Sequence, residues 1–198
     1  MKVLLINGSP NEKGCTYTAL SAVAESLNEC GVETEIVYVA GPGKEKYIPS
    51  ACDFSVADEV LAKAKEADGF VFGTPDHYAG MSGVMKSFMD YFFWFAGDSV
   101  RNKPAAAVAS GRRAGCTSAL TNVYQYFGNA DMHIVSSMGW NVVHGNTPAE
   151  VLQDEEGLFC LRTLGKNMAW LLKCIEAGKA AGITAPEKEK KPRTSFIR

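Results

Sequence analysis

Short apolar runs alternate with longer segments of helical periodicity along the whole chain. The apolar runs have the length of buried strands and lie at Val3–Ile6, Thr34–Val39, Gly69–Gly73, Ala105–Ala109 and Asn141–His144. The segments with apolar residues at helical spacing lie at Thr16–Cys30, Val56–Ala67, Gly83–Phe95, Thr117–Phe127 and Asp154–Gly178. This alternation predicts an α/β fold in which a doubly wound, five-stranded parallel sheet carries helices on both faces.

The handedness of the connections limits the possible orders of the strands. Right-handed crossovers leave few topologies, and the expected order is 2-1-3-4-5, with a ligand at the carboxyl ends of the first, third and fourth strands. No repeat or linker divides residues 1–182, which we expect to form one domain. Residues 183–198 are rich in proline and charge. We expect this tail to be disordered or to dock on a neighbouring subunit through Phe196 and Ile197.

The loop after the first strand contains the most informative residues. Asn7-Gly8-Ser9-Pro10 forms a turn cluster, and a helical segment begins near Thr16. A helix N-terminus offers unpaired N–H groups and the positive end of a dipole, so it suits a phosphate. Ser9, Cys15 and Thr16 could contribute side chains to such a site. The alternative is an ordinary strand-to-helix turn with a Ser or Thr cap.

Three common phosphate loops are excluded here. Lys13-Gly14 has the reverse order of a Walker A ending, and Pro10 stands where a dinucleotide fingerprint needs its second glycine. A cysteine phosphatase loop needs an arginine six residues after the cysteine, and the residue six after Cys15 is Ser21. The remaining possibility is a cation-free loop that holds a phosphate with hydroxyls and backbone amides.

Two further loops carry polar and glycine residues at predicted strand ends. The third strand leads into Thr74-Pro75-Asp76-His77-Tyr78, which combines a rigid proline with flat side chains suited to a planar ligand. The fourth strand leads into Ser110-Gly-Arg-Arg-Ala-Gly115, another donor-rich entry to a helix. Taken singly, each is equally a turn with surface side chains; three such loops on adjacent strands favour one binding site.

Composition narrows the classes of protein and of partner. The 198 residues are 46% hydrophobic and 21% charged, as in ordinary globular domains, and the net charge of −2 gives no basic field for nucleic acid. The apolar stretches are too short to cross a membrane, and the first residues do not resemble a secretion signal. We therefore expect a cytoplasmic protein. None of the six cysteines stands in a C-x-x-C pair, so we expect no metal site and mostly reduced thiols.

Two motifs together resemble a known family. Gly8-Ser-Pro-x-x-x-Gly-x-Thr16 and Thr74-Pro-x-x-Tyr-x-x-Met-Ser-Gly-x-x-Lys86-x-Phe88 look like those of the flavodoxin-like NAD(P)H-dependent FMN reductases, a group that includes the iron–sulfur flavoproteins. The resemblance spans about residues 1–178. It implies a flavodoxin-like domain over residues 1–182, noncovalent FMN, and a homodimer or tetramer with the flavin near the subunit interface.

The resemblance also implies a set of cofactor-binding residues. Ser9, Gly14 and Thr16 would surround the phosphate, the segment from Pro75 to Met81 would line the isoalloxazine, and that from Ser110 to Gly115 would close the other side. The full expected set is Ser9, Gly14, Cys15, Thr16, Thr74, Pro75, Asp76, His77, Tyr78, Met81, Ser110, Gly111, Arg112 and Gly115.

The sequence departs from the family pattern in three places. The iron–sulfur flavoproteins carry a compact cysteine cluster after the second strand, whereas Ala40–Ser55 has only Cys52, so we expect no cluster. Cys15 stands where relatives often have Asn. Asp76 and His77 stand where relatives often have an apolar residue and Tyr, and these positions face the reacting ring in the family, which leaves the substrate open.

The expected function is an FMN-dependent oxidoreductase that passes electrons from NADH or NADPH to a small acceptor such as a flavin or quinone. The flavin performs the redox chemistry. His77 could orient or protonate the acceptor, and Arg112 or Arg113 could stabilise developing charge. His133 and His144 have no supporting motif and are interpreted as structural. The alternatives are an electron carrier of the flavodoxin kind, disfavoured by the weak net charge, and a non-redox module on the same fold.

Assembly is indicated by three features of the sequence. The block Tyr91–Phe95 has more aromatic surface than one helix stripe can bury in its own core, although core and boundary positions also explain it. The loop Ala40–Ser55 is longer than a simple connection and is expected at the edge of the sheet that holds the cofactor. The tail ends in the apolar pair Phe196-Ile197. We therefore expect at least a dimer, with the flavin site completed by a neighbour.

Overall fold

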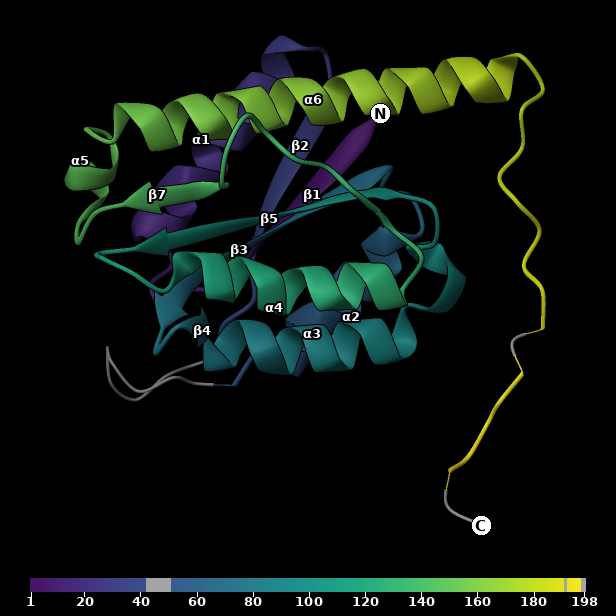
Figure 1. Cartoon of the computed structure of the whole chain (residues 1–198), viewed down its shortest axis with the longest axis horizontal. Helices are drawn as coiled ribbons and strands as arrows, with labels where there is room; N and C mark the ends of the chain where they lie inside the picture. The colour runs from purple at the N-terminus through teal and green to yellow at the C-terminus, as the bar shows by residue number, and fades with distance from the viewer. Residues whose placement is uncertain (42–50, 191, 197–198) are drawn as a thin grey trace.

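The structure is a computed structural model that describes residues 1–41, 51–190 and 192–196. Its centre is a sheet in the order β2-β1-β3-β5-β6, in which the strands of this path are all parallel (Figure 1). The strands are β1 (Lys2–Asn7), β2 (Glu33–Tyr38), β3 (Gly69–His77), β4 (Gly80–Met81), β5 (Pro104–Gly111), β6 (His133–Ile134) and β7 (Val142–His144). The predicted order 2-1-3-4-5 is confirmed, because β6 and β7 share the fifth position beside β5.

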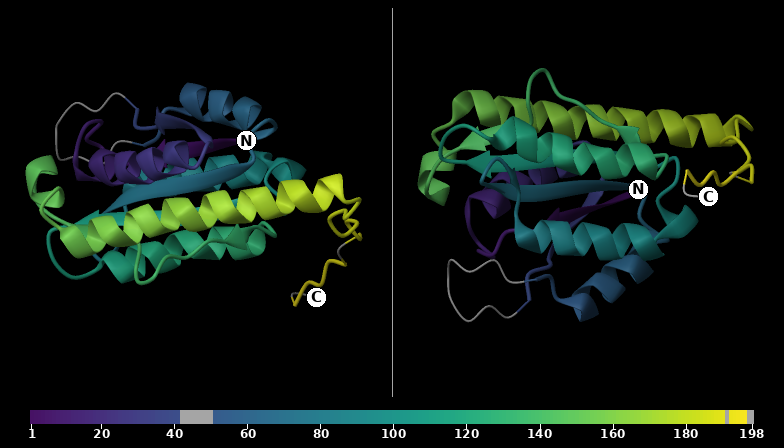
Figure 2. Two further views of the ribbon diagram at one scale, coloured as in Figure 1. Left: turned by 90° about the horizontal axis from the view of Figure 1, so that it is seen from above. Right: turned by 60° about the horizontal axis from the view of Figure 1, so that its bottom comes forward.

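Helices cover both faces of the sheet. They are α1 (Cys15–Glu29), α2 (Phe54–Ala64), α3 (Gly83–Phe95), the 3-10 turn η1 (Gly97–Ser99), α4 (Cys116–Asn129), α5 (Pro148–Val151) and α6 (Glu155–Ala180). One hydrophobic core lies between the sheet and α1 with α6, and a second lies between the sheet and α2, α3 and α4. Figures 1 and 2 show α6 along one side of the sheet and the α3–α4 pair along the other.

The two cores explain why the strand sequences are continuously apolar. Val3 and Leu5 of β1 point into the core under α1 and α6, whereas Leu4 and Ile6 point into the core under α2 to α4. Side chains of a strand alternate between faces, so a strand covered on both sides needs apolar residues at every position. The apolar runs at Val3–Ile6, Gly69–Gly73 and Ala105–Ala109 are therefore the central strands β1, β3 and β5.

Two short strands, β6 and β7, stand where the sequence predicted one fifth strand. The expected strand at Asn141–His144 is β7, but a separate two-residue strand, β6, pairs with the start of β5 before it. The short β4 is also additional, and it pairs antiparallel with the end of β3. Strands of two residues leave too little sequence for periodicity to be recognised.

The chain after α6 has neither helix nor strand among its described residues. Near its start, Arg101 donates a hydrogen bond to the Pro186 carbonyl at 3.0 Å, and Lys188 pairs with Asp98 at 2.5 Å. Phe196 is 97% exposed, and Figure 1 shows the tail extending past the body of the domain. Lys191, Ile197 and Arg198 lie outside the described residues, as does the stretch 42–50 of the loop expected over Ala40–Ser55. No helix in the described ranges is long and apolar enough to cross a membrane.

Candidate functional site

The carboxyl edge of the sheet surrounds a hollow of about 260 Å³. Its lining comes from the last residues of β3 and β5, from the loops after β1, β5 and β7, and from the start of α1, because the parallel direction of these strands brings their ends to one edge. The residues that line this hollow, called the strand-end hollow below, are Ser9, Pro10, Asn11, Cys15, Thr16, Pro75, Asp76, His77, Ser110, Gly111, Arg112, Gly145 and Asn146.

Hydroxyl groups and a helix end form one wall of the strand-end hollow. α1 begins after the extended residue Gly14, and no side chain of the described residues caps it. The Thr16 and Ser110 hydroxyls lie 2.9 Å apart, and the Ser9 hydroxyl accepts the Asn11 N–H at 3.0 Å. Since no acidic residue lies in the first turn of α1, this end of the hollow suits an anion.

The loop after β1 is held in shape by its own residues. The Asn7 amide group donates to the Glu12 carbonyl at 2.9 Å and accepts the Ser9 N–H at 3.2 Å. Gly8 packs so closely on Met85 that a Cβ there would lie 2.6 Å from that side chain. The loop is therefore fixed from both sides, and Ser9 keeps its place beside the helix end.

Two residues predicted for the site after β3 lie elsewhere. The buried Thr74 hydroxyl donates to the Pro75 carbonyl at 2.9 Å and accepts the Ser82 N–H at 3.0 Å, so it stabilises the turn. Tyr78 is fully exposed at the tip of the β3–β4 hairpin, where it and Ala79 have positive φ values of 54° and 57°. Two left-handed residues are what a tight hairpin turn requires, and neither residue here is a glycine.

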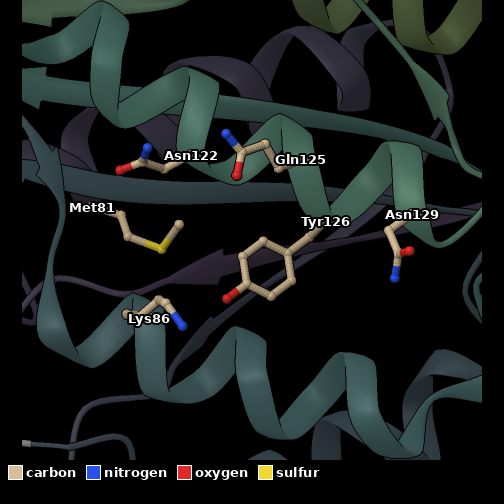
Figure 3. A pocket seen from close by; sticks show the side chains of 6 residues that line it. All are labelled: Met81, Lys86, Asn122, Gln125, Tyr126 and Asn129. Carbon is tan, nitrogen blue, oxygen red and sulfur yellow. The ribbon is translucent and has the colours of Figure 1, made fainter. Parts of the chain in front are cut away.

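Met81 lines a different hollow, the groove between α3 and α4. This groove has a volume of about 660 Å³ and is lined by Met81, Lys86, Asn122, Gln125, Tyr126 and Asn129 (Figure 3). The Lys86 ammonium donates to the Asp90 carboxylate at 2.6 Å, and the Tyr126 hydroxyl bonds to the same carboxylate. Because this lysine is neutralised by its partner, the groove is polar but carries little net charge.

A carboxylate lies against the start of α4. Asp76 lines the strand-end hollow, and its Oδ1 is buried with no hydrogen-bond partner among the described residues. Gly115, with a φ of 117°, precedes α4, and a Cβ there would overlap the Asp76 carboxylate. The glycine is thus needed both for its left-handed backbone and for the close approach of Asp76.

Neither Cys15, which lines the strand-end hollow, nor Cys116 at the start of α4 is an activated thiol. Burial, with a smaller contribution from Asp76, raises the pKa of Cys116 to about 11. Burial also raises the pKa of Cys15, whose thiol lies 3.7 Å from the Gly145 carbonyl. Thiolate chemistry needs a lowered pKa, so neither cysteine suits a nucleophilic role. Among the described residues, no group of three His, Cys, Asp or Glu side chains is placed to hold a metal ion.

The histidines differ in their surroundings. Burial lowers the pKa of the partly buried His77, and the nearby Asp76 opposes this shift. His77 is therefore mainly uncharged at neutral pH. His144 has its Nδ1 3.2 Å from the Gly111 carbonyl, and its backbone N–H donates to Asp154 at 2.7 Å. His133 is exposed on β6 and borders a hollow at the opposite end of the strands.

The strand-end hollow contains most of the expected site but not all of it. Ser9, Cys15, Thr16, Pro75, Asp76, His77, Ser110, Gly111 and Arg112 line it, whereas the predicted Gly14, Thr74, Tyr78, Met81 and Gly115 are not in its lining. The sequence analysis missed Pro10, Asn11, Gly145 and Asn146. Gly145-Asn146 is a turn pair directly after a predicted strand, so the reasoning applied to the other strand ends could have found it.

Comparisons with known proteins identify a family of flavin-dependent reductases. The sequence model of a family described as NADPH-dependent FMN reductase matches residues 1–147. An iron-sulfur flavoprotein of Methanocaldococcus jannaschii is 31% identical over 194 residues, which cover 89% of this chain and 100% of that protein. An NADPH azoreductase of a Bacillus species is 31% identical over 121 residues, 58% of this chain and 62% of that protein.

The fold has close counterparts among solved structures. A flavodoxin from the domain Archaea superimposes with a TM-score of 0.63 at 18% identity, over 87% of this chain and 99% of that one. An identity this low supports the flavodoxin-like architecture alone. The strand-end hollow lies where such architectures bind their ligands, outside the carboxyl ends of the strands.

Proposed function

Because this chain belongs to the NADPH-dependent FMN reductase family, we propose that it passes electrons from NADH or NADPH through noncovalent FMN to a small acceptor, such as a free flavin or a quinone. The observation that carries the proposal is the strand-end hollow, where buried hydroxyls surround an uncapped helix end. Residues 1–182 would form the FMN-binding domain.

The residues present fit the phosphate end of FMN. Ser9, Thr16 and Ser110 are buried polar side chains at the start of α1, and their hydroxyls can donate to phosphate oxygens while the helix dipole attracts its charge. Lys and Arg side chains are not needed for such a site, because backbone N–H groups supply the donors.

The other end of the strand-end hollow suits the flavin ring. Pro75 and His77 at the end of β3, Gly111 at the end of β5 and Arg112 directly after it line this part. Proline and glycine leave room for a flat ligand to approach the backbone. When bound, FMN supplies the transfer of hydride and electrons. The chain's own contribution is to hold the ring and to control charge and protons beside it.

His77 and Arg112 are the side chains that we propose control charge and protons beside the flavin ring. An uncharged His77, whose pKa burial lowers, can donate a hydrogen bond to an acceptor oxygen and can pass on a proton that it regains from water. The exposed Arg112 can attract a phosphate or carboxylate of a substrate that enters the strand-end hollow. Neither cysteine takes part, because burial keeps both thiols protonated.

This function needs no iron–sulfur cluster in the chain, in contrast to the name of the related flavoprotein. The segment Ala40–Ser55 contains only Cys52, and a cluster needs several thiolate ligands. We also propose a homodimer or tetramer in the cytoplasm, where reduced thiols and reduced nicotinamide are both available.

The absorption spectrum of the purified protein tests the proposal. We expect flavin bands, release of FMN and not FAD on heating, and bleaching of the bands by NADH or NADPH without oxygen. The preparation should contain no stoichiometric iron. A colourless protein that takes up no FMN when the cofactor is added would contradict the proposed function, and stoichiometric FAD would contradict the choice of cofactor.

A further inference from the structure

Asp76 lines the strand-end hollow, and one oxygen of its carboxylate is buried without a hydrogen-bond partner among the described residues. Asp76 Oδ1 and Asn141 Oδ1 are the buried side-chain oxygens without a hydrogen-bond partner among the described residues. Asn141 lies outside the hollow and still donates to Tyr124 at 3.4 Å through its amide nitrogen. Asp76 lines the hollow, so the charge of its carboxylate lies beside the space that a bound molecule would fill.

Asp76 neither caps a helix nor forms an ion pair among the described residues. Asp76 approaches the start of α4 closely, yet no side chain of the described residues caps that helix. Asp76 takes part in none of the ion pairs of the described residues, and Arg112 and Arg113 are exposed. A carboxylate with a buried, unpaired oxygen destabilises a fold, and Asp76 thus has no evident structural role that offsets this cost.

The charge of Asp76 affects its neighbours. It contributes to the raised pKa of Cys116 on α4 and opposes the lowered pKa of His77 on β3. Both groups border the strand-end hollow or lie directly behind it. An anionic group in the hollow would therefore experience the same field, at a dielectric constant below that of water.

We propose that Asp76 makes the strand-end hollow bind oxidised FMN in preference to reduced FMN; this inference rests on the proposed function. Reduction adds two electrons and one proton to the flavin ring. The reduced ring therefore carries one more negative charge than the oxidised ring. The carboxylate repels that charge, so reduced FMN binds less tightly than it would without Asp76. The midpoint potential of bound FMN differs from that of free FMN by the difference between the binding free energies of its two redox states. Weaker binding of the reduced form lowers this potential, so the bound flavin is a stronger reductant for its acceptor.

The test is the midpoint potential of bound FMN, measured by anaerobic titration with a reference dye at pH 7. Asp76→Asn keeps the shape of the side chain and removes its charge, whereas Asp76→Val also removes the acceptor oxygens. We expect reduced FMN to gain about tenfold in affinity relative to oxidised FMN in both variants. For a two-electron couple that gain raises the potential by about 30 mV.

Two control variants isolate the charge at this position. Asp76→Glu keeps the carboxylate and should stay near the wild-type potential. Glu59→Gln removes a carboxylate from the exposed face of α2 and should leave the potential unchanged. Circular dichroism and FMN stoichiometry establish that each variant is folded and loaded before its potential is measured.

The outcomes separate this inference from the proposed function. A wild-type potential in both FMN-loaded neutral variants overturns the role of Asp76. A shift in Asp76→Val without one in Asp76→Asn also overturns it, because the hydrogen bond and not the charge would then matter. A wild-type protein that binds no FMN refutes the proposed function itself.

Discussion

At the scale of single residues, the buried hydroxyls beside α1 give the most direct prediction. Thr16→Ala and Ser9→Ala should each raise the dissociation constant of FMN roughly tenfold to a hundredfold. Each removes a hydrogen bond to a charged phosphate, worth on the order of 1.5–3 kcal/mol. Fluorescence titration of the apoprotein measures the effect.

A matched control lies two residues further along the same helix. Thr18 donates its hydroxyl to the Gly14 carbonyl at 3.3 Å and is not in the lining of the strand-end hollow. Thr18→Ala should therefore keep the wild-type affinity for FMN. If Ser9→Ala and Thr16→Ala bind FMN as tightly as this control, the phosphate is held elsewhere.

The lowered pKa of His77 predicts how the free energy of unfolding of the apoprotein depends on pH. Burial lowers its folded-state pKa below the ordinary value of 6.5, so on acidification the unfolded chain takes up a proton before the folded chain does. The free energy of unfolding should then fall as the pH drops below about 6.5, until the folded-state pKa is passed. His77→Gln should lose less stability than the wild type between pH 7 and pH 5.5. Urea titrations at both values measure this, and equal losses would refute the assignment.

At the scale of elements, α4 offers two glycines with opposite expectations. Gly115 has a φ of 117° and no room for a Cβ beside Asp76, whereas Gly128 has nothing within 4 Å of its Cβ position. Gly115→Ala should lower the free energy of unfolding by more than about 1 kcal/mol. Gly128→Ala should raise it by about 0.5–1 kcal/mol, because alanine is the better helix former.

Chemical denaturation of the two glycine variants tests this pair. The measurement should be made on apoprotein, so that a change in FMN affinity does not contribute. A neutral Gly115→Ala would mean that the start of α4 adjusts easily, and the close approach of Asp76 would then not be a fixed feature of the site.

At the scale of the whole molecule, exposed aromatic side chains favour self-association. Trp94 and Phe95 at the end of α3 are 82% and 60% exposed, Trp140 is 67% exposed beside β7, and Phe196 is exposed in the tail. Exposed large apolar side chains on several elements leave surface that a second copy of the chain could cover. We expect the full chain to sediment as a dimer or tetramer that retains FMN.

A chain that ends at Gly182 tests the contribution of the tail. If the tail is part of the interface, the truncated chain should dissociate or lose flavin at micromolar concentration. If both chains sediment as monomers and still oxidise NADH or NADPH fully with FMN bound, the shared site is refuted. If both remain oligomeric and loaded, the interface lies on the domain, and the tail is not needed for it.

The sequence by itself determined the architecture and the region of the site. Continuous apolar runs such as Val3–Ile6 required strands covered on both faces, and right-handed crossovers then left few strand orders, among them the one observed. These are local patterns combined with a general rule of handedness, so one sequence suffices to apply them. The same rule brought Ser9, His77 and Ser110 together, because all three lie at or just beyond the carboxyl ends of parallel strands.

Only the tertiary structure decided how individual side chains are used. Thr74 lies in the last half of β3, where its hydroxyl accepts the Ser82 N–H, whereas Asp76 two residues later borders the strand-end hollow. Gly145 joins the lining because β7 pairs with the end of β5, a contact between distant parts of the chain. Side-chain direction and the supply of hydrogen-bond partners depend on packing between distant segments. The unsatisfied oxygen of Asp76 could therefore appear only once β3, β5 and α4 were in place.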